Sequence, residues 1–427
     1  MPSVEVLQIV PRARRAPCAP IGAIRRCAGA FGSPRRGWVP YLVGMSIFGR
    51  RLSVEVPASR VTNLELFFDL VFVFTITQLT ALLEHELSIA GALRVLLVFA
   101  ALWWMYGGYA WLTNQVPPTT PRRQLPMLVA MAGFLICAIS VPSVFDGSGI
   151  AFGIGYLIVV CVHLVMLNQS STRKGVLRLA PFNLVSALLI LVAGFVDGVP
   201  MYVLWVVAIA IQMITPYLGV APQFELNAEH FVERHGLLII VALGESVIAI
   251  GLSAQTDNVS AGLAAVVVLA LALPAALWWT YFSSGDDLKA EHALATAEPG
   301  PRALLAIRGY FYAHIPMLIG ILAIAVGMHQ IIAHPTARLG AAGSVALATG
   351  VALFYLGDAE FRRVLQIGPS RVRVLVAVAG LATIPLGLFV AGWVQLAAAV
   401  AVVSAPLVVE QMRRTTASGW GRLQETH

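Results

Sequence analysis

Residues 61–83 read VTNLELFFDLVFVFTITQLTALL, a segment apolar and long enough to cross a bilayer that nevertheless carries Glu65 and Asp69. A transmembrane helix needs about 20 apolar residues, and a carboxylate at membrane depth costs roughly 3 kcal/mol. At 3.6 residues per turn, one helical face carries Thr62, Glu65, Asp69, Val73, Ile76 and Thr80, whereas Phe67, Phe74 and Gln78 point elsewhere. We therefore expect both acids to face protein or water, with a functional site beside them.

The composition indicates a polytopic membrane protein. Of the 427 residues, 59% are hydrophobic and 11% are charged, compared with about 25% charged residues in soluble domains, and the mean hydropathy is +0.83. Strands of a membrane barrel would be about 10 residues long and alternate apolar with polar side chains, so the longer apolar segments predict an all-α fold. The twelve candidate spans are 61–83, 91–114, 124–144, 149–168, 180–197, 200–218, 231–253, 259–282, 303–332, 338–357, 373–390 and 393–412.

Basic residues gather in every second loop between these spans. By the positive-inside rule the arginine-rich segment 1–60 is cytoplasmic, and the same side then holds Arg122, Arg123, Arg173, Lys174, Arg178, Arg362, Arg363, Arg371 and Arg373. The opposite loops hold Glu84, Glu86, Asp146, Asp197 and Asp257. This alternation predicts an even number of spans with both termini in the cytoplasm. It also explains the net charge of +7 without a nucleic-acid partner.

Two similar sequences indicate that a six-helix unit is repeated. Residues 101–106 read ALWWMY and residues 276–281 read ALWWTY, although two Trp pairs that anchor helices at the membrane interface are the alternative explanation. Repeats with an even number of spans run in the same sense across the bilayer, which predicts parallel repeats at 61–220 and 228–412. The offset of 175 residues (278 minus 103) aligns Asp69 with Gly244, next to Glu245. We therefore expect Asp69 and Glu245 to meet at the repeat interface.

The ends of the chain are expected to lie outside the helical repeats. Segment 1–60 is basic, is interrupted by Pro and Gly, and contains no span. We expect it to be disordered and to face anionic lipid, with an amphipathic anchor, a targeting segment or an over-long start as alternatives, since Met45 begins MSIFGRR. On the last alternative, residues 1–44 would not belong to the native protein. Residues 413–427 are expected to form a cytoplasmic tail.

The segment around the seventh span combines charges at its beginning with an acid deep inside. His230, Glu233, Arg234 and His235 precede or begin the span, and a solvated helix end is the alternative explanation for them. Arg234 is expected to act as a charge at the cytoplasmic mouth of a path. Glu245 lies eleven residues further, on the same helical face as Arg234 and too deep to reach the surface. Its alternative role is a structural hydrogen bond.

The ninth span contains a second polar group. Tyr310 and His314 lie one turn apart, and Pro316 removes a backbone hydrogen bond, which predicts a kink. His314 could relay protons near neutral pH, and a simple hydrogen bond between histidine and tyrosine is the alternative. Arg308 is a candidate counter-charge for Glu65 or Asp69.

Several catalytic signatures are absent from the sequence. It has no Walker lysine in a glycine-rich loop, no H-E-x-x-H and no G-x-S-x-G. The four cysteines form no C-x-x-C pair, so we expect no zinc site. Asp286 and Asp287 resemble the aspartate pairs that hold Mg²⁺ in diphosphate-transferring membrane enzymes, but only one such pair occurs. We expect no metal and no cofactor, and an enzymatic role is less favoured than transport.

Three blocks of sequence resemble the bacterial low temperature requirement A (LtrA) family. They are Glu65-Leu-Phe-Phe-Asp69-Leu-Val-Phe-Val-Phe with Ile76-Thr-Gln78-Leu, then Arg234-His235-Gly236 with Ala242-Leu-Gly-Glu245-Ser246, and Tyr312-x-His314. The resemblance covers about 61–412 and implies a multi-pass protein of the bacterial inner membrane, in a family named for growth in the cold. It implies no particular molecular activity. A more distant similarity links Phe68-Asp69 to the F-S-D motif of two-repeat potassium channels, although the Ser is absent.

These observations predict secondary transport or conduction of a small solute or cation. Because two acids four residues apart repel when both are ionised, coupling to protons is also expected. The path should be lined by Glu65, Asp69, Arg234, Glu245, Arg308, Tyr310 and His314 on the first, seventh and ninth spans. The expected partners are the lipid bilayer and the transported solute, and the oligomeric state remains open. The alternatives are a membrane enzyme acting on a lipid or polyprenyl substrate and a sensor or scaffold that transports nothing.

Overall fold

The computed structural model describes residues 46–47, 50–51, 60–168, 173–217, 226–254, 260–282 and 285–424. The chain divides into two units, Met1–Ala58 and Ser59–His427. In the first unit, β1 (Ser46–Ile47) and β2 (Arg50–Arg51) pair antiparallel. The remainder of the predicted segment 1–60, apart from residue 60, lies outside the described residues.

In the described residues of the second unit, the regular secondary structure is helical. Its first half comprises α1 (Asn63–His85), α2 (Ile89–Gln115), α3 (Pro121–Ser140), η1 (Val141–Ser143), α4 (Gly149–Leu167), α5 (Arg173–Ala193), α6 (Val199–Ile214) and η2 (Thr215–Tyr217). Its second half comprises α7 (Ala228–Ser253), α8 (Ala261–Phe282), α9 (Asp286–Thr296), α10 (Pro299–Ala306), η4 (Ile307–Tyr312), α11 (His314–Ala333), α12 (Ala341–Leu365), α13 (Arg371–Leu381), α14 (Ile384–Phe389) and α15 (Gly392–Gln424).

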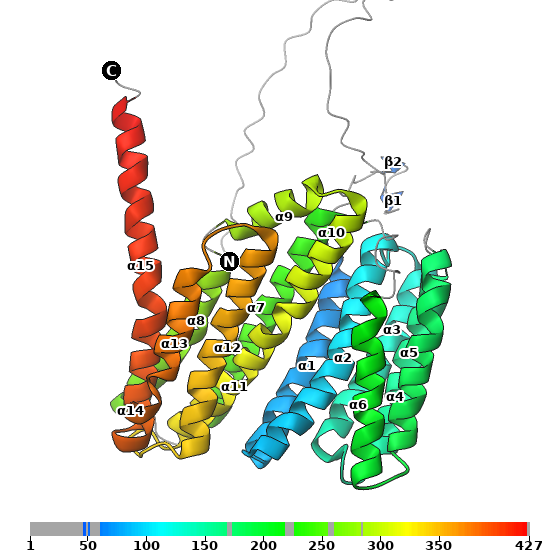
Figure 1. Ribbon diagram of the computed structural model, residues 1–427, viewed down its shortest axis with the longest axis horizontal. Helices are drawn as coiled ribbons and strands as arrows, with labels where there is room; N and C mark the ends of the chain where they lie inside the picture. The colour runs from blue at the N-terminus through cyan, green and yellow to red at the C-terminus, as the bar shows by residue number, and fades with distance from the viewer. Residues whose placement is uncertain are drawn as a thin grey trace, which may run out of the picture. The chain divides into compact units, whose positions relative to one another are not determined.

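The described residues confirm an all-α, multi-pass architecture. Eleven helical segments are long and apolar enough to cross a membrane, as judged from length and composition. The remaining expected span, 180–197, is the fifth in chain order and coincides in part with α5, whose apolar part Leu179–Ala193 is shorter than the others. The beginning of α1 and the end of α15 lie at the same end of the helical unit, as an even number of crossings requires (Figure 1).

Two of the expected spans are interrupted within their length. The ninth contains the π-helical turn η4, with α10 before it and α11 after it, and π-helical turns are frequent at functional sites. The eleventh is divided into α13 and α14 at Ala382–Thr383. Residues 413–424, expected in a separate tail, continue the backbone of α15.

The helix that carries the two acids begins with a capping box. The Thr62 side chain accepts a hydrogen bond from the Glu65 N–H, while the Glu65 carboxylate accepts one from the Thr62 N–H at 2.9 Å. This reciprocal arrangement satisfies two of the backbone donors that the first turn of a helix leaves unpaired. One carboxylate oxygen of Glu65 therefore fixes the start of α1, and the other is available for a partner on another helix.

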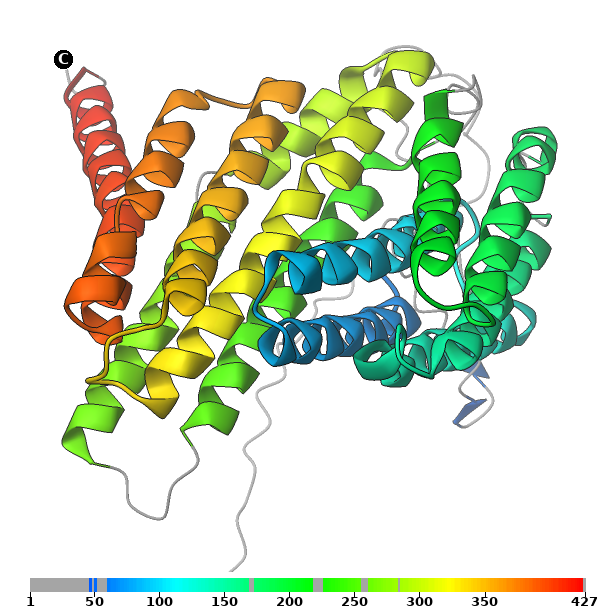
Figure 2. The same cartoon turned by 60° about the horizontal axis from the view of Figure 1, so that its bottom comes forward.

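The order of helix contacts in the first half is similar to that in the second half. In the first half α1 contacts α2 and α3, and the pairs α3–α4, α4–α5, α5–α6 and α2–α6 follow. In the second half α7 contacts α8 and α11, and the pairs α11–α12, α12–α13, α13–α15 and α8–α15 follow. The halves lie side by side (Figure 1) and meet where α1 contacts α7 and α11, and α2 contacts α7. Figure 2 shows α11 between α12 and the pair α1–α2.

The matching Trp pairs occupy different surroundings in the two halves. Trp103 is fully buried, and its ring N–H donates to the Phe311 carbonyl at 3.1 Å. By contrast, Trp278 and Trp279 are 45% and 48% exposed, as expected for side chains at a membrane interface. The interface-anchor explanation therefore fits α8 but does not fit Trp103 of α2.

Candidate functional site

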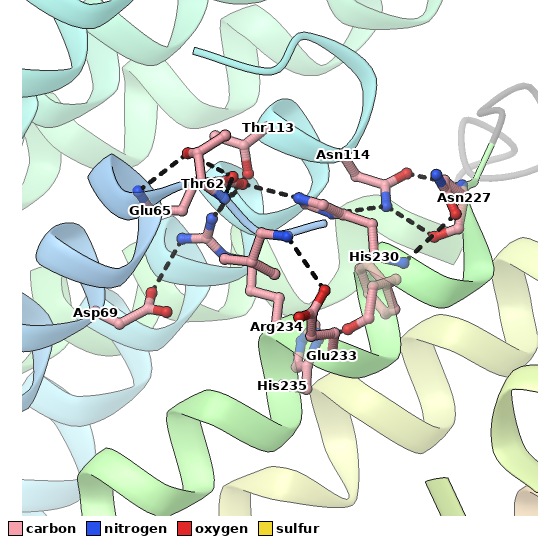
Figure 3. A network of polar contacts seen from close by, with 12 residues as sticks. Thr62, Glu65, Asp69, Thr113, Asn114, Asn227, His230, Glu233, Arg234 and His235 are labelled. Carbon is pink, nitrogen blue, oxygen red and sulfur yellow. Dashed lines mark hydrogen bonds and ion pairs between the residues drawn. The ribbon is translucent and has the colours of Figure 1, made fainter. Parts of the chain in front are cut away.

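A buried ion-pair network joins α1 to α7 at the end where both helices begin. Glu65, Asp69 and Arg234 are each 0% exposed. Arg234 donates from Nη1 to Glu65 Oε1 at 2.7 Å and from Nη2 to Asp69 Oδ1 at 3.0 Å. Figure 3 shows the guanidinium between the two carboxylates. The acids thus face protein, as predicted, while Phe67 and Phe74 are exposed on the other side of α1. The burial of Arg234 contradicts the alternative of a solvated helix end at this position.

Side chains of α2 and α7 complete this network. Thr113 Oγ1 accepts a second hydrogen bond from Arg234 Nη1 at 2.9 Å, and the Tyr106 hydroxyl donates to Asp69 Oδ1 at 3.0 Å. His230 Nε2 lies 3.1 Å from Glu65 Oε1. The His230 ring also contacts Asn114 Nδ2 at 3.2 Å, on the side facing Asn227 (Figure 3). Tyr106 and Thr113 could not be predicted as members of the site, because no feature of the α2 sequence indicates which of its turns faces α1.

Two buried polar atoms of the network form no hydrogen bond with the described residues. Asp69 Oδ2 and Arg234 Nε are buried without a hydrogen-bond partner. The Arg234 guanidinium also lies 5.7 Å from the ring centroids of Phe68 and Tyr106, at cation–π distance. Two carboxylates share one arginine, so one formal negative charge is left over unless His230 carries a proton or a cation binds. Asp69 Oδ2 is an acceptor of this network that forms no hydrogen bond among the described residues.

Glu245 lies further along the same interface and does not contact Asp69. Its carboxylate accepts a hydrogen bond from Thr77 Oγ1 at 2.6 Å. Since Thr77 is eight residues beyond Asp69 on α1, the two positions differ by about 12 Å along the helix axis. The helices therefore face each other as the repeat alignment suggested, but the alignment misplaced the acids by two turns. The apolar Phe72, Val73 and Ile76, all buried, occupy the interval.

A third polar group lies at the opposite end of this interface. Glu84 at the end of α1 lies 3.7 Å from His329 Nδ1 on α11. The same ring nitrogen contacts Ser253 Oγ on α7 at 2.8 Å. Charged and polar side chains therefore occur near both ends and in the middle of the interface among α1, α7 and α11.

Arg308 is not the counter-charge of the buried acids. Its side chain is exposed on η4, and Arg234 pairs with both acids instead. The sequence placed Arg308 on the ninth span, but the structure places it in the π-helical turn η4. Helical periodicity cannot anticipate such a turn.

Tyr310 and His314 form an aromatic cluster with His235, as their one-turn spacing suggested. The Tyr310 and His314 rings stack with centroids 5.3 Å apart, and the rings of His235 and His314 are 5.6 Å apart. His314 contacts the Tyr281 hydroxyl at 3.0 Å and the Gly309 carbonyl at 3.0 Å. The histidine–tyrosine bond considered from sequence therefore exists, but it joins His314 to Tyr281. The buried Tyr310 hydroxyl has no hydrogen-bond partner among the described residues.

Two further buried ion pairs stabilise the second half. Asp286 of α9 pairs with Arg362 of α12, and Asp358 of α12 lies 2.8 Å from Arg373 of α13. Arg362 and Arg373 were counted from sequence as loop charges, yet they are 4% and 3% exposed. Asp286 also binds Lys289 at 3.0 Å, so its carboxylate is already engaged by two basic side chains.

Two cavities adjoin these groups. One, of about 390 Å³, lies where α7 begins, beside α8, α9 and η4; among its lining residues are Glu233, Asp287, Tyr281 and Tyr310. The other, of about 120 Å³, is mostly apolar and lies among α2, α4, α5 and η4, with His163 in its wall. Neither is lined by Glu65, Asp69 or Glu245. In the described ranges, no group of three or more His, Cys, Asp or Glu side chains is arranged to hold a metal ion.

Comparison with known proteins gives one family and one relative. The family model described as "Bacterial low temperature requirement A protein (LtrA)" matches residues 60–408. An uncharacterized protein of Rhizobium meliloti (strain 1021) is 28% identical over 317 residues, which cover 70% of this chain and 76% of that relative. No solved structure matches the chain significantly.

Proposed function

The chain belongs to the bacterial low temperature requirement A (LtrA) family, and we propose that it is a secondary transporter of a small cation. The observation that carries the proposal is the series of polar groups along the interface of α1 with α7 and α11. The series begins at Glu65 and ends at Glu84. Nineteen residues of helix span roughly 28 Å, which is close to the thickness of the hydrocarbon core, about 30 Å.

The charges of this interface favour a cation. Glu65, Asp69, Glu245 and Glu84 contribute four carboxylates, against the single guanidinium of Arg234. Acids within membrane spans usually line ion or proton pathways, and carboxylates select cations in pores. Asp69 Oδ2, buried without a hydrogen bond, is the acceptor on which an arriving cation or proton would bind. Exchange of a cation for a proton at this carboxylate would couple the two fluxes.

The apolar interval between the polar groups corresponds to a closed path. Between Asp69 and Thr77, the buried side chains of α1 are Phe72, Val73, Thr75 and Ile76, and no cavity described above reaches Asp69 or Glu245. Transporters alternate between states that open to one side of the membrane at a time. We infer that the Arg234 network closes the end of the path at which α1 and α7 begin.

We further infer that two parallel six-helix repeats build the transporter. The similar order of helix contacts in the two halves supports this inference, as does a matching detail of their helix crossings. A Cβ on Gly133 of α3 would lie 2.9 Å from the Gly155 carbonyl of α4, and one on Gly320 of α11 would lie 2.6 Å from the Gly350 carbonyl of α12. Third and fourth helices thus cross through a glycine pair in each half. Substrate sites of duplicated transporters lie at the repeat interface, which here is the α1–α7 contact.

Cation flux into proteoliposomes tests the proposed role of Asp69. Asp69→Asn keeps the shape but removes the charge, and we expect flux to fall about tenfold, the effect of losing about 1.4 kcal/mol of cation binding. Asp197→Asn is the matched control, because Asp197 is exposed in the loop before α6. The cation flux of this variant should equal that of the unmodified protein. Flux of Asp69→Asn equal to that of the control would remove the acid from the mechanism.

A membrane enzyme acting on a lipid or polyprenyl substrate is the second candidate. The observation in its favour is that the 390 Å³ cavity lies beside Asp287 and Tyr281 and not beside Asp69. Against it, Asp286 is occupied by Arg362 and Lys289, so the aspartate pair is not free to hold Mg²⁺. A lipid product that forms with the purified protein and disappears in Asp287→Asn would favour the enzyme over the transporter.

The orientation in the membrane follows from the loop charges. The positive-inside rule supports an inner-membrane protein with both termini in the cytoplasm, and the cavity beside Asp287 would then open toward the cytoplasm. The proposed partners are therefore the bilayer and a cytoplasmic cation. A homo-oligomer is compatible with this arrangement and is not required by it.

A further inference from the structure

The 390 Å³ cavity carries an acidic pair on each of two helices. Glu229 and Glu233 are four residues apart on α7, and Asp287 and Glu291 are four residues apart on α9. Side chains at this spacing lie on the same face of a helix. Both pairs line the same cavity, so each helix presents two carboxylates to it.

These carboxylates are not neutralised by the protein. Within the described part of the chain, none of the four forms an ion pair with a Lys, Arg or His side chain. Arg60 is the one basic residue that lines the cavity. Glu229 and Asp287 are close enough to Glu291 to repel its charge. Because like charges at this spacing destabilise a protein, the arrangement favours binding of a cation.

A buried hydroxyl provides a second and independent indication of a ligand. Tyr310 is 0% exposed and lines the cavity, and its hydroxyl has no hydrogen-bond partner among the described residues. The hydroxyl is near enough to Asp287 and Glu291 to interact with them electrostatically. Buried polar groups are nearly always paired, so this hydroxyl marks a position where a donor or acceptor of a bound molecule completes the site.

The shape and the lining of the cavity indicate an organic cation and not a bare metal ion. In the described ranges, the carboxylates are not gathered into a set that could ligate a metal. The volume of about 390 Å³ falls in the range of small-molecule sites, about 300–1,000 Å³. Tyr281, Phe282 and Phe361 also line the cavity, and aromatic rings attract ammonium groups and cover methylene chains.

We propose that this cavity binds an aliphatic diamine or polyamine, with one ammonium group on the α7 carboxylates, another on the α9 carboxylates, and the methylene chain against the aromatic rings. The proposal rests on the proposed transport function, because it names the substrate class that enters the path. The two acidic pairs lie on different helices, so a molecule with a positive charge at each end can place one charge on each pair. A single monovalent cation would leave most of the negative charge of the four carboxylates unpaired.

Titration calorimetry on the full chain in detergent tests the proposal with putrescine, spermidine, tetramethylammonium and potassium as probes. We expect both amines to bind at least about tenfold more tightly than the two monovalent cations, since a charge-assisted contact is worth about one factor of ten or more. Tighter binding of tetramethylammonium or potassium would overturn the proposal, as would no binding of any amine.

Three variants locate the site. Glu291→Gln should weaken spermidine binding about tenfold, whereas Glu298→Gln, which alters an exposed residue at the start of α10, should leave binding unchanged. Tyr310→Phe removes only the unpaired hydroxyl, so it should weaken binding without lowering the melting temperature. Equal binding by Glu291→Gln and the Glu298→Gln control would refute the assignment of the cavity.

Flux measurements separate this inference from the transport proposal. Amine binding without cation flux would refute transport and leave the site standing. Potassium flux by a protein that binds no amine would refute the site and leave transport standing. Saturable spermidine flux that falls in both Asp69→Asn and Glu291→Gln would support both.

Discussion

At the scale of single residues, Arg234 carries the largest predicted effect on stability. Arg234→Met leaves Glu65 and Asp69 buried without a positive partner, and breaking a buried ion pair in this way costs about 3–5 kcal/mol. Arg234→Lys keeps the charge but cannot donate to both carboxylates with the same planar geometry, so its loss should be intermediate. Thermal unfolding in detergent measures the stability of both Arg234 variants. Arg308→Met is the control, because Arg308 is exposed, and it should change stability by less than about 0.5 kcal/mol.

A triple variant separates stability from function. Combining Arg234→Met with Glu65→Gln and Asp69→Asn removes every charge of the pair network, and neutral replacements of buried ion pairs are often as stable as the original. We expect the triple variant to regain most of the melting temperature lost by Arg234→Met but no cation flux. Flux at the unmodified level in a stable triple variant would show that the network only holds helices together.

The sequence predicted the site incompletely at this scale, for an identifiable reason. The helical period correctly placed Glu65 and Asp69 on the buried face of α1. It could not identify Arg234 as their partner, because the pairing depends on how α7 packs against α1. A charge near a helix end is usually solvated, and here the end of α7 is covered by α2 through Asn114.

At the scale of secondary-structure elements, the crossing of α11 and α12 through Gly320 and Gly350 predicts that no larger side chain can be accepted at Gly320 without moving the helices. A Cβ on Gly320 would lie 2.6 Å from the Gly350 carbonyl and 2.8 Å from the Phe354 backbone nitrogen, so the helices must separate. Gly320→Ala should destabilise the protein by about 1–3 kcal/mol, the usual effect of overpacking. Gly244→Ala is the matched control, because a Cβ there has no neighbour within 4 Å, and it should be neutral or slightly stabilising. Equal melting temperatures for the two variants would contradict the close crossing.

Hydropathy predicted the number and positions of the helices well and their interruptions poorly. All twelve expected spans coincide with helical segments, because an apolar stretch in a bilayer must satisfy its own backbone hydrogen bonds. The π-helical turn Ile307–Tyr312 leaves no signal in composition. Pro316 predicted a kink at about this place, but the irregular backbone lies one turn earlier, in the segment that contains the exposed Arg308.

At the scale of the whole molecule, the helices before and after residues 218–225 form two groups that meet mainly along α1, α2, α7 and α11. Each group closes most of its contacts internally. The contacts between them are specific side-chain bonds, such as Tyr312 to the Met213 carbonyl at 3.1 Å and Trp103 to the Phe311 carbonyl. The loop charges predicted that the helices alternate across the membrane, which stays a prediction. The contact between halves could not be predicted, because it is a tertiary arrangement that the repeat offset located only to within two turns.

This organisation predicts that the chain can be divided between its halves and still work. Helical membrane proteins assemble from preinserted helices, so residues 1–217 and 226–427, expressed as separate chains, should copurify and retain at least about half of the flux of the intact chain. A cut at Gly147, in the loop before α4, is the matched control. This cut separates α3 from α4, which cross through Gly133 and Gly155. The resulting fragments should assemble less well, because the cut falls inside the first half of the chain. Failure of the first pair of fragments to copurify, or equal recovery from both cuts, would mean that the two halves are not independent units of assembly.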